Sequence, residues 1–399
     1  MGFPEDGVRV AVAGGGLQGL EVTYLARKAG YETLLLDRED APPAAGLCHE
    51  FVSLDMEDHH ALGQAAESAD VVIPATENAG ALRSLVEWCR KAEVLLAFDP
   101  EAYAISSSKI ASQALFSRLG IPTPRPWPEC PFPVLAKPDS GSGSRGIQLF
   151  PDGPSLEARF GPSPPVDWVL QEYLEGPSFS IEVLGRPGAY LPFQVTDLEM
   201  DPAFDCKRVR APASVPAHLA DTLRSMTISL AQGVDLTGIM DVEAILHDGV
   251  LKVLEIDARF PSQTPMAVYQ ASGVNMVELL VGLLLDETGN GPTPAPSFGK
   301  DAAIVEHVQV RPGQLFVRGE GIMAQAGPLH LEAGFFGAHE ALTDYSPGSR
   351  NWVVTLMIRG SDPEDAMSCR DRVLAEIRRR FGLDDYHDEY PREVRRREK

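Results

Sequence analysis

The sequence predicts an α/β protein that begins with a doubly wound parallel sheet. Over the first hundred or so residues, short apolar runs alternate with helical stretches, which is typical of a parallel sheet covered by helices. A glycine-rich loop and an acidic hairpin follow in the middle of the chain. A stretch rich in Gly and Pro at 288–296 indicates a linker before the last region. We therefore expect three domains, at 1–102, 103–290 and 297–399, the last being a smaller α+β domain.

Charge and composition exclude several classes of partner. The 399 residues include 35 Lys and Arg against 57 Asp and Glu, for a formal charge of -22. Nucleic acids and anionic membranes bind basic surfaces, so we expect neither as a partner. The longest apolar stretch, near 276–281, is far shorter than the roughly 20 residues that span a bilayer. The N-terminus has no basic region and the five cysteines form no CxxC pair, so we expect a cytoplasmic location.

The first region shows repeated strand and helix patterns. Apolar runs at 8–13, 33–36, 70–74 and 94–98 predict strands, and helical patterns follow the first and third of them. Gly14, Gly16 and Gly19 form a GxGxxG motif after the first run, and Asp37 stands 18 residues further on. This arrangement is also the fingerprint of a Rossmann-like dinucleotide site. An NAD-dependent oxidoreductase is therefore one alternative, and a ligase with a secondary nucleotide site at Asp37 is another.

The middle region contains a glycine-rich loop directly after an apolar strand. The pattern predicts a helix over 108–119, a strand over 133–137, and then the loop 137–146 with Gly141, Gly143 and Gly146. Glycines let a backbone approach a ligand closely, and the N–H groups of such a loop can hold phosphate oxygens beside the Lys137 ammonium. The loop is not a Walker motif, and a surface turn is its alternative interpretation.

Two pairs of carboxylates lie in apolar segments on either side of residues 247–249. Asp241 and Glu243 form one pair and Glu255 and Asp257 the other, each with the i, i+2 spacing that points both side chains to one face of a strand. We therefore expect a β-hairpin. Four carboxylates on one face need neutralising cations, and we expect one or two Mg²⁺ ions, two being favoured, because Mg²⁺ binds such oxygens together with substrate phosphates. A solvated acidic hairpin is the alternative.

The length of the hairpin loop decides whether the two pairs share a face. A two-residue turn at 248–249 would place Glu243 opposite Leu254 and leave the pairs on opposite faces. A three-residue loop with Gly249 in the left-handed conformation would place Asp241 opposite Glu255 on one face. The metal hypothesis requires the second arrangement.

The order of these features resembles the ATP-grasp fold over about 106–278. The resemblance implies that two lysines bind the nucleotide, that the glycine-rich loop contacts the phosphates, that residues 172–175 hold adenine and ribose, and that two glutamates ligate Mg²⁺. Asp257 stands where the superfamily more often has Asn. The nucleotide residues implied are Lys109, Lys137, Ser142, Gly143, Glu172, Tyr173, Leu174 and Glu175, with Asp37 added for the secondary site; the metal ligands are Glu243, Glu255 and Asp257.

A closer resemblance exists to the 3-methylornithine–lysine ligase family of pyrrolysine biosynthesis. It rests on the segments 14–19, 74–78, 98–103, 238–244 and 254–265, and the chain departs from it at Gly16, where the family has a lysine. The family reaction uses ATP and Mg²⁺. The carboxylate of (3R)-3-methyl-D-ornithine is activated as an acyl phosphate, and the ε-amine of L-lysine attacks it. The products are 3-methylornithyl-N6-lysine, ADP and phosphate.

This second resemblance implies further roles. Arg259, with Lys137, is the catalytic candidate because a cation can stabilise the oxyanion of the acyl-transfer step. Glu77 has the alternative role of a carboxylate at a helix start. The alternative functions are another ATP-grasp carboxylate-amine ligase, a carboxylase-like enzyme that uses bicarbonate, and a ligand-binding module without turnover. A homodimer is one assembly to consider. The methylornithine-binding candidates are Ser180, Glu182, Asp241, Asp257, Ser262, Gln263 and Thr264, and the lysine-binding candidates are Leu17, Gln18 and Glu77.

Overall fold

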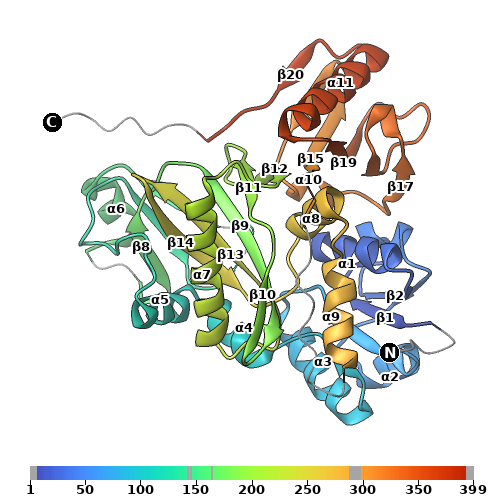
Figure 1. Cartoon of the computed structure of the whole chain (residues 1–399), viewed down its shortest axis with the longest axis horizontal. Coiled ribbons are helices and arrows are strands. Elements are labelled where there is room, and N and C mark those ends of the chain that lie inside the picture. Colours follow the sequence, from blue (N-terminus) through green and yellow to red (C-terminus); the bar gives the residue numbers. More distant parts are fainter. Residues whose placement is uncertain are drawn as a thin grey trace.

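The computed structural model describes residues 7–141, 143, 146–162, 165–286, 298–299 and 301–391. The predicted linker and the boundaries at 290 and 297 lie outside these ranges, as does Ser142. Figure 1 shows the N-terminal region in blue, the middle region in green and the C-terminal region in orange and red, grouped around a large sheet.

The N-terminal region forms the predicted parallel sheet. Its order is β3-β2-β1-β4-β5, and every neighbouring pair is parallel. The order reverses between β1 and β4, so the residues that follow these two strands line the crevice where open α/β sheets bind ligands. The elements are β1 (Arg9–Ala13), α1 (Leu17–Lys28), β2 (Glu32–Asp37), β3 (Glu50–Ser53), α2 (His59–Ala66), β4 (Val71–Pro74), α3 (Ala79–Ala92) and β5 (Leu95–Leu96).

A small three-stranded antiparallel sheet follows, in the order β7-β6-β8. It packs around its own apolar cluster, which includes Val134, Phe150 and Leu156. The glycine-rich loop connects β6 to β7, so its position depends on this sheet. The elements are α4 (Pro100–Ser106), α5 (Lys109–Leu119), β6 (Val134–Pro138), β7 (Gln148–Phe150), α6 (Gly153–Phe160) and β8 (Trp168–Glu172).

The described residues of the middle and C-terminal regions share one 12-stranded sheet. Its main path is β14-β13-β9-β11-β12-β15-β19-β18-β17, and antiparallel pairing of β12 with β15 joins the two regions. The C-terminal strands therefore extend the middle sheet. The strands are β9 (Ser178–Arg186), β10 (Ala189–Pro192), β11 (Thr196–Met200), β12 (Cys206–Ala211), β13 (Gly238–His247), β14 (Val250–Asp257), β15 (Ala302–Arg311), β16 (Gln314–Val317), β17 (His330–Ala333), β18 (Glu340–Thr343), β19 (Trp352–Gly360) and β20 (Asp385–His387).

Helices cover both faces of this sheet. Helices α7 (Ala217–Gly233) and α11 (Pro363–Phe381) pack on one face, while α8 (Thr264–Ser272) packs on the other and is followed by α9 (Met276–Leu285). The short helix α10 (Gly321–Ala324) lies on the α8 side. The N-terminal region docks there through α1. The Gln270 amide donates to the Tyr24 hydroxyl at 2.6 Å, and the Asn275 amide donates to the Leu25 carbonyl at 2.8 Å.

Within the described ranges, no single helix is long and apolar enough to cross a membrane. Helices α8 and α9 together have the length and apolar composition of a membrane span, but the two helices are bent by 99° relative to each other.

Candidate active site

The acidic hairpin is built by a two-residue turn together with a β-bulge. Asp248 and Gly249 occupy the turn with positive φ angles of 50° and 78°, and His247 pairs with Val250. The register then shifts between Glu243 and Ala244, because Leu254 is an extra residue on β14. Glu243 consequently faces Glu255, and Asp241 faces Asp257. Both expected registers were wrong, since the turn has two residues but the bulge restores the shared face.

The neighbouring strand β9 adds a further carboxylate to this face. Glu182 pairs with Asp241, and Ser180 pairs with Glu243. Glu182 is fully buried, and burial raises the pKa of its carboxyl to about 7. Burial and then the charge of Glu255 raise the pKa of Glu243 to about 7, and burial together with Asp257 raises that of Asp241. The face is therefore an acidic surface that lacks enough cations of its own.

Arg259 connects the hairpin to the N-terminal sheet. Its guanidinium lies 2.7 Å from Asp257 on the hairpin and 2.7 Å from Glu77, which follows β4. The carbonyl oxygen of the Gln18 side chain, in the amide orientation that satisfies both of its polar atoms, accepts from the same guanidinium. Glu77 does not cap α3, because the Asn78 side chain accepts the hydrogen bond from the Ala81 N–H. Two of the three predicted lysine-binding residues therefore meet the predicted catalytic arginine; Leu17 begins α1 next to Gln18.

A polar cavity of about 150 Å³ lies over the acidic face. Three buried oxygens of its lining form no hydrogen bond: one carboxylate oxygen of Asp257, the side-chain carbonyl of Gln263 and the hydroxyl of Thr264. The predicted residue Glu182 does not line the cavity; it lies beside Asp241 on β9, and its two buried carboxylate oxygens also form no hydrogen bond. Such atoms favour a ligand that brings hydrogen-bond donors. The predicted methylornithine-binding residues that line it are Ser180, Asp241, Asp257, Ser262, Gln263 and Thr264.

Two acidic residues near this cavity were not predicted. Glu320 lines the cavity and accepts from the Ser262 hydroxyl at 3.2 Å, and burial raises its pKa to about 7. Glu21 accepts from the backbone N–H of Gln263 and of Met266, which helps to hold Gln263 at a positive φ of 67°. Neither residue lies in a motif, and both reach the site only through the packing of distant segments.

A second cavity of about 480 Å³, the larger of the two at the acidic hairpin, lies between this hairpin and the three-stranded sheet. Lys109 begins α5, donates to the Gly141 carbonyl at 2.7 Å and lies 3.7 Å from Glu255. Lys137 is buried in β6, and burial lowers the pKa of its ammonium. Gly143, Glu243 and Glu255 line both this cavity and the smaller one. The two cavities therefore meet at the paired glutamates.

The segment expected to hold adenine and ribose lines the larger cavity. Glu172, Tyr173, Leu174 and Glu175 all contribute. The Glu172 carboxylate is occupied by protein groups, because it accepts from Arg125 Nε at 2.8 Å and from Lys252. The backbone of Glu175 contacts the ring of His247 at the hairpin turn. The cavity also includes Tyr390 and Pro391, which the sequence analysis did not identify.

Asp37 lies elsewhere. It ends β2 and accepts from the Gly15 N–H at 2.5 Å, and it lines a separate cavity of about 660 Å³ with Gly14 and Gly16. A side chain at Gly14 would meet the Ala75 carbonyl oxygen at 2.3 Å, which accounts for the glycine there. The structure thus does not bring Asp37 together with Lys109 and Lys137.

A nucleotide-sized cavity between two sheets, with two lysines and paired carboxylates at one end, is typical of ATP-grasp enzymes. The family model of the ATP-grasp domain matches residues 106–263. Among solved structures, an N5-carboxyaminoimidazole ribonucleotide synthetase in complex with ADP has a TM-score of 0.68 at 17% identity, covering 92% of this chain and 96% of its own. The biotin carboxylase domain of the Hydrogenobacter thermophilus 2-oxoglutarate carboxylase has a TM-score of 0.71 at 16% identity, covering 92% and 89%. These likenesses concern the fold.

Relatives in sequence are more specific. The 3-methyl-D-ornithine–L-lysine ligase of Methanosarcina mazei is 32% identical over 94% of this chain and 96% of its own length. That of Methanosarcina acetivorans is also 32% identical, over 94% and 98%. The chain belongs to this family of ATP-grasp ligases. The predicted fold class, family and ATP-dependent ligase activity are confirmed, whereas an oxidoreductase does not fit the family.

Proposed function

We propose that the protein activates (3R)-3-methyl-D-ornithine with ATP and joins it to the ε-amine of L-lysine. An oxygen of the methylornithine carboxylate attacks the γ-phosphorus, and ADP leaves. The ε-ammonium of lysine loses a proton to solvent, and the resulting amine attacks the acyl carbon. The C–O bond of the acyl phosphate breaks, phosphate leaves with its electrons, and the nitrogen releases a second proton as the amide forms. The products are 3-methylornithyl-N6-lysine, ADP and phosphate. The names of the family members support this choice of substrates.

The observation that carries the proposal is the meeting of two cavities at Glu243 and Glu255. The larger cavity has lysines for a polyphosphate, and the smaller one is lined by a buried Asp257 oxygen that forms no hydrogen bond. The two Glu182 oxygens, also buried without hydrogen bonds, lie on the neighbouring strand beside Asp241. A diamino acid brings ammonium donors to these oxygens while its carboxylate points toward the phosphates. Glu182 and Asp257 are the acceptors we assign to the ammonium groups, and Ser180, Asp241 and residues 262–264 complete the lining.

The paired glutamates fit a Mg²⁺ ion. Glu243 and Glu255 face each other across the hairpin, and the raised pKa of Glu243 reflects two carboxylates that share a buried site without a sufficient cation. Within the described ranges, no group of three His, Cys, Asp or Glu side chains forms a preformed metal site. Mg²⁺ commonly takes one or two carboxylates and completes its shell with phosphate oxygens and water. When bound, the ion neutralises charge on the transferring phosphoryl group, and Asp257 is a further candidate ligand.

The remaining charged groups have distinct assignments. Lys109 and Lys137 bind phosphate oxygens, with Gly143 and Ser142 of the loop between β6 and β7. Arg259 stabilises the oxyanion that forms when the amine attacks. Gln18, Glu77 and Leu17 bind lysine, whose ε-amine must reach the acyl phosphate in a site that excludes water. Asp37, which lines the separate cavity with Gly14 and Gly16, is the candidate residue for a second nucleotide.

The test is mass spectrometry of a reaction that contains the protein, ATP, Mg²⁺, L-lysine and (3R)-3-methyl-D-ornithine. We expect one dipeptide-like product for each ADP released, and none when either amino acid is omitted. ADP release that requires bicarbonate instead of methylornithine would favour the carboxylase-like alternative. Light scattering of the same sample tests the homodimer, an assembly suggested by the dimeric biotin carboxylase domain among the solved structures.

A further inference from the structure

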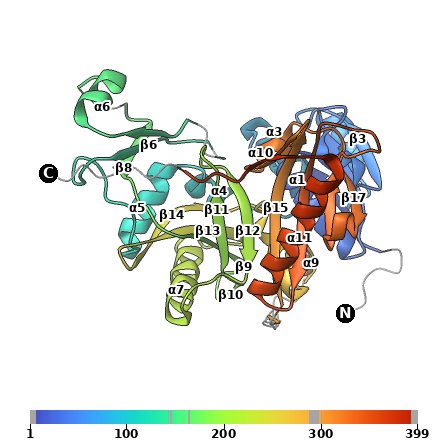
Figure 2. The same cartoon turned by 90° about the horizontal axis from the view of Figure 1, so that it is seen from above.

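The C-terminal segment 388–391 reaches the larger cavity from a distant part of the chain. Tyr390 and Pro391 line this cavity together with Glu199, Met200 and Phe204 of the large sheet and its adjoining loop. Figures 1 and 2 show the red segment leaving the C-terminal region beyond β20 and passing across the large sheet toward the three-stranded sheet. The wall of the nucleotide cavity therefore includes a part of the chain that lies outside the matched ATP-grasp domain.

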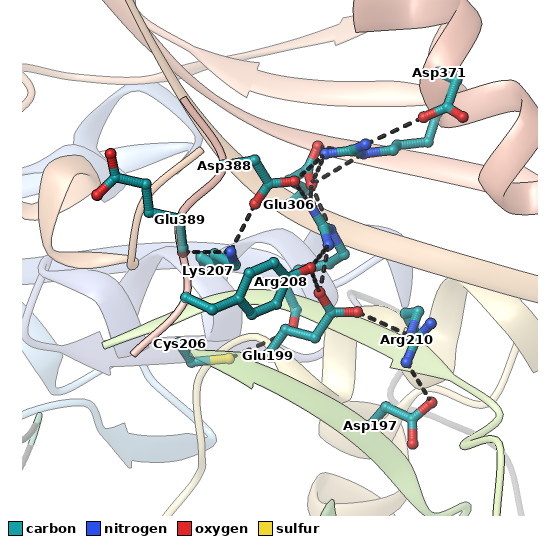
Figure 3. A network of polar contacts seen from close by, with 12 residues as sticks. Asp197, Glu199, Cys206, Lys207, Arg208, Arg210, Glu306, Asp371, Asp388 and Glu389 are labelled. Carbon is teal, nitrogen blue, oxygen red and sulfur yellow. Dashed lines mark hydrogen bonds and ion pairs between the residues drawn. The ribbon is translucent and has the colours of Figure 1, made fainter. Parts of the chain in front are cut away.

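An anchor of buried ion pairs fixes this segment (Figure 3). The Asp388 carboxylate lies 2.6 Å from Lys207 Nζ, 2.7 Å from Arg208 Nη2 and 3.0 Å from Arg370 Nη2. Burial alone would raise the pKa of Asp388, but the hydrogen bond from Lys207 and the charge of Arg208 hold it at about 2. The Glu389 carbonyl accepts a second hydrogen bond from Lys207 at 2.6 Å.

The buried Lys207 ammonium has its ion-pair partner in this segment. Four cations and five carboxylates meet in the cluster, and the ion pair found for Lys207 among the described residues is the one with Asp388. The cluster consists of Lys207, Arg208, Arg210 and Arg370 with Asp197, Glu199, Glu306, Asp371 and Asp388. The Lys207 side chain is 0% exposed, because it is the extra residue of a bulge between β11 and β12. A fully buried ammonium without a carboxylate is strongly unfavourable. Docking of Asp388 is therefore part of the folded state.

The same anchor orients Tyr390. Its ring centroid lies 3.4 Å from Lys207 Nζ, its hydroxyl donates to Glu199 at 2.8 Å, and Arg208 donates to that hydroxyl at 3.3 Å. Tyr390 is 53% exposed although three groups contact it. Tyr390 lines the larger cavity and not the smaller one, whereas Met200 and Phe204 of the same wall line both, as Glu243 and Glu255 do. Tyr390 is thus part of the wall of the larger cavity on the side of Glu199 and Phe204.

We propose that Tyr390 is a nucleotide-contacting residue in the wall of the larger cavity, and that Asp388 is the residue that positions it. The inference rests on the proposed function in one respect, because it takes the nucleotide to occupy the larger cavity. An aromatic ring fixed in this way gives contact area for a purine at a low cost in conformational entropy. The C-terminal segment then contributes directly to the affinity for ATP.

Calorimetric titration of the full-length protein with MgADP tests the proposal. We expect Tyr390→Ala to raise the dissociation constant about five- to tenfold, as for the loss of one aromatic contact, while the protein stays folded with a small fall in melting temperature from the lost contacts to Glu199 and Lys207. The matched control is Tyr386→Ala, because Tyr386 is a second tyrosine of the same cluster, with its hydroxyl donating to Asp388 at 3.0 Å, but it lies outside the cavity lining found among the described residues. This control should keep the dissociation constant within about twofold of the wild type.

The double variant Asp388→Asn/Tyr390→Ala separates positioning from stability. If Asp388 acts on the nucleotide through Tyr390, Asp388→Asn weakens ADP binding, but the double variant binds ADP no more weakly than Tyr390→Ala alone. Unchanged ADP affinity in Tyr390→Ala, or additive effects in the double variant, would overturn the inference. A wild-type protein that does not bind MgADP at all would overturn the proposed function as well.

Discussion

The Glu77 carboxylate lies 2.7 Å from the Arg259 guanidinium, although 182 positions separate the two residues. Glu77 follows a strand of the N-terminal sheet and Arg259 follows the acidic hairpin, so this ion pair joins the two halves of the site. The Asp257 carboxylate contacts the same guanidinium at 2.7 Å. A lysine ε-amine bound by Glu77 would consequently lie beside the cation that we assign to the oxyanion.

The position of Glu77 beside Arg259 predicts that substituting Glu77 affects lysine binding and not ATP binding. We expect Glu77→Ala to raise the KM for L-lysine roughly ten- to a hundredfold, the loss of a charge-assisted contact, while the KM for ATP changes little. Steady-state assays with each substrate varied in turn measure both values. Asn78→Ala is the control, because it removes the cap of α3 and should cost about 1 kcal/mol of stability without changing lysine kinetics. A normal lysine KM with a reduced kcat in Glu77→Ala would mean that Glu77 only positions Arg259.

The paired glutamates give a second prediction. Glu255→Gln should abolish ADP formation and leave the fold intact, because one charged oxygen is lost from a site that needs anionic ligands for Mg²⁺. ADP release and far-ultraviolet circular dichroism of the variant check the two halves of this statement. Asp248→Asn in the turn of the same hairpin is a matched control, since its side chain is 82% exposed and Asn tolerates the positive φ at this position. Normal turnover in Glu255→Gln would remove the hairpin from the mechanism.

Local patterns predicted much of this site. The i, i+2 spacing of Asp241 and Glu243 and of Glu255 and Asp257 reports the strand period directly, so the acidic face could be expected before the structure was known. The bulge at Leu254 could not be expected, because it depends on how two strands pair and has no clear composition signal. The number of residues in the turn alone therefore predicted the wrong strand register.

Other features depend on packing between segments that are far apart in the chain. Tyr390 reaches the nucleotide cavity because Lys207, more than 180 positions earlier, is buried in a bulge and needs Asp388. The pairing of β12 with β15, which extends the middle sheet into the C-terminal region, spans three intervening helices and a hairpin. No periodicity in the sequence records such contacts.

Lys137 and Asp37 were both considered for nucleotide binding, and we expect substitutions at these two residues to have different effects on the KM for ATP. Lys137→Met should raise the KM for ATP by at least about tenfold, because a buried cation in the cavity shared with Glu255 is lost. Asp37→Ala should leave this KM within about twofold, because Asp37 lines a different cavity. Initial rates at varied ATP concentration test both variants. An equal rise in both would place Asp37 at the reacting nucleotide.

The buried carboxyl of Glu182 predicts a specific dependence of stability on pH. Burial raises its pKa in the folded protein to about 7, from an ordinary value of 4.5. Between these values the folded state binds more protons than the unfolded state, so the contribution of Glu182 to stability is greatest at low pH and falls as the pH rises through 7. Above that pH, the ligand-free protein holds an ionised carboxylate whose two oxygens form no hydrogen bond.

Glu182→Gln should therefore stabilise the ligand-free protein at pH 8 while it impairs methylornithine activation. Because each unit of pKa difference corresponds to about 1.4 kcal/mol, we expect a gain of up to roughly 3 kcal/mol at pH 8 and little change at pH 4.5. Urea unfolding at the two pH values measures the gain, and the exposed Glu157→Gln on α6 is the control.

Methylornithine should stabilise the wild type more at pH 8 than at pH 4.5, because its ammonium group supplies the missing partner of the Glu182 carboxylate. It should have little effect on Glu182→Gln. A variant that is no more stable than the wild type at pH 8 would mean that Glu182 has a partner in the folded protein, and it could not then be the acceptor for the substrate ammonium.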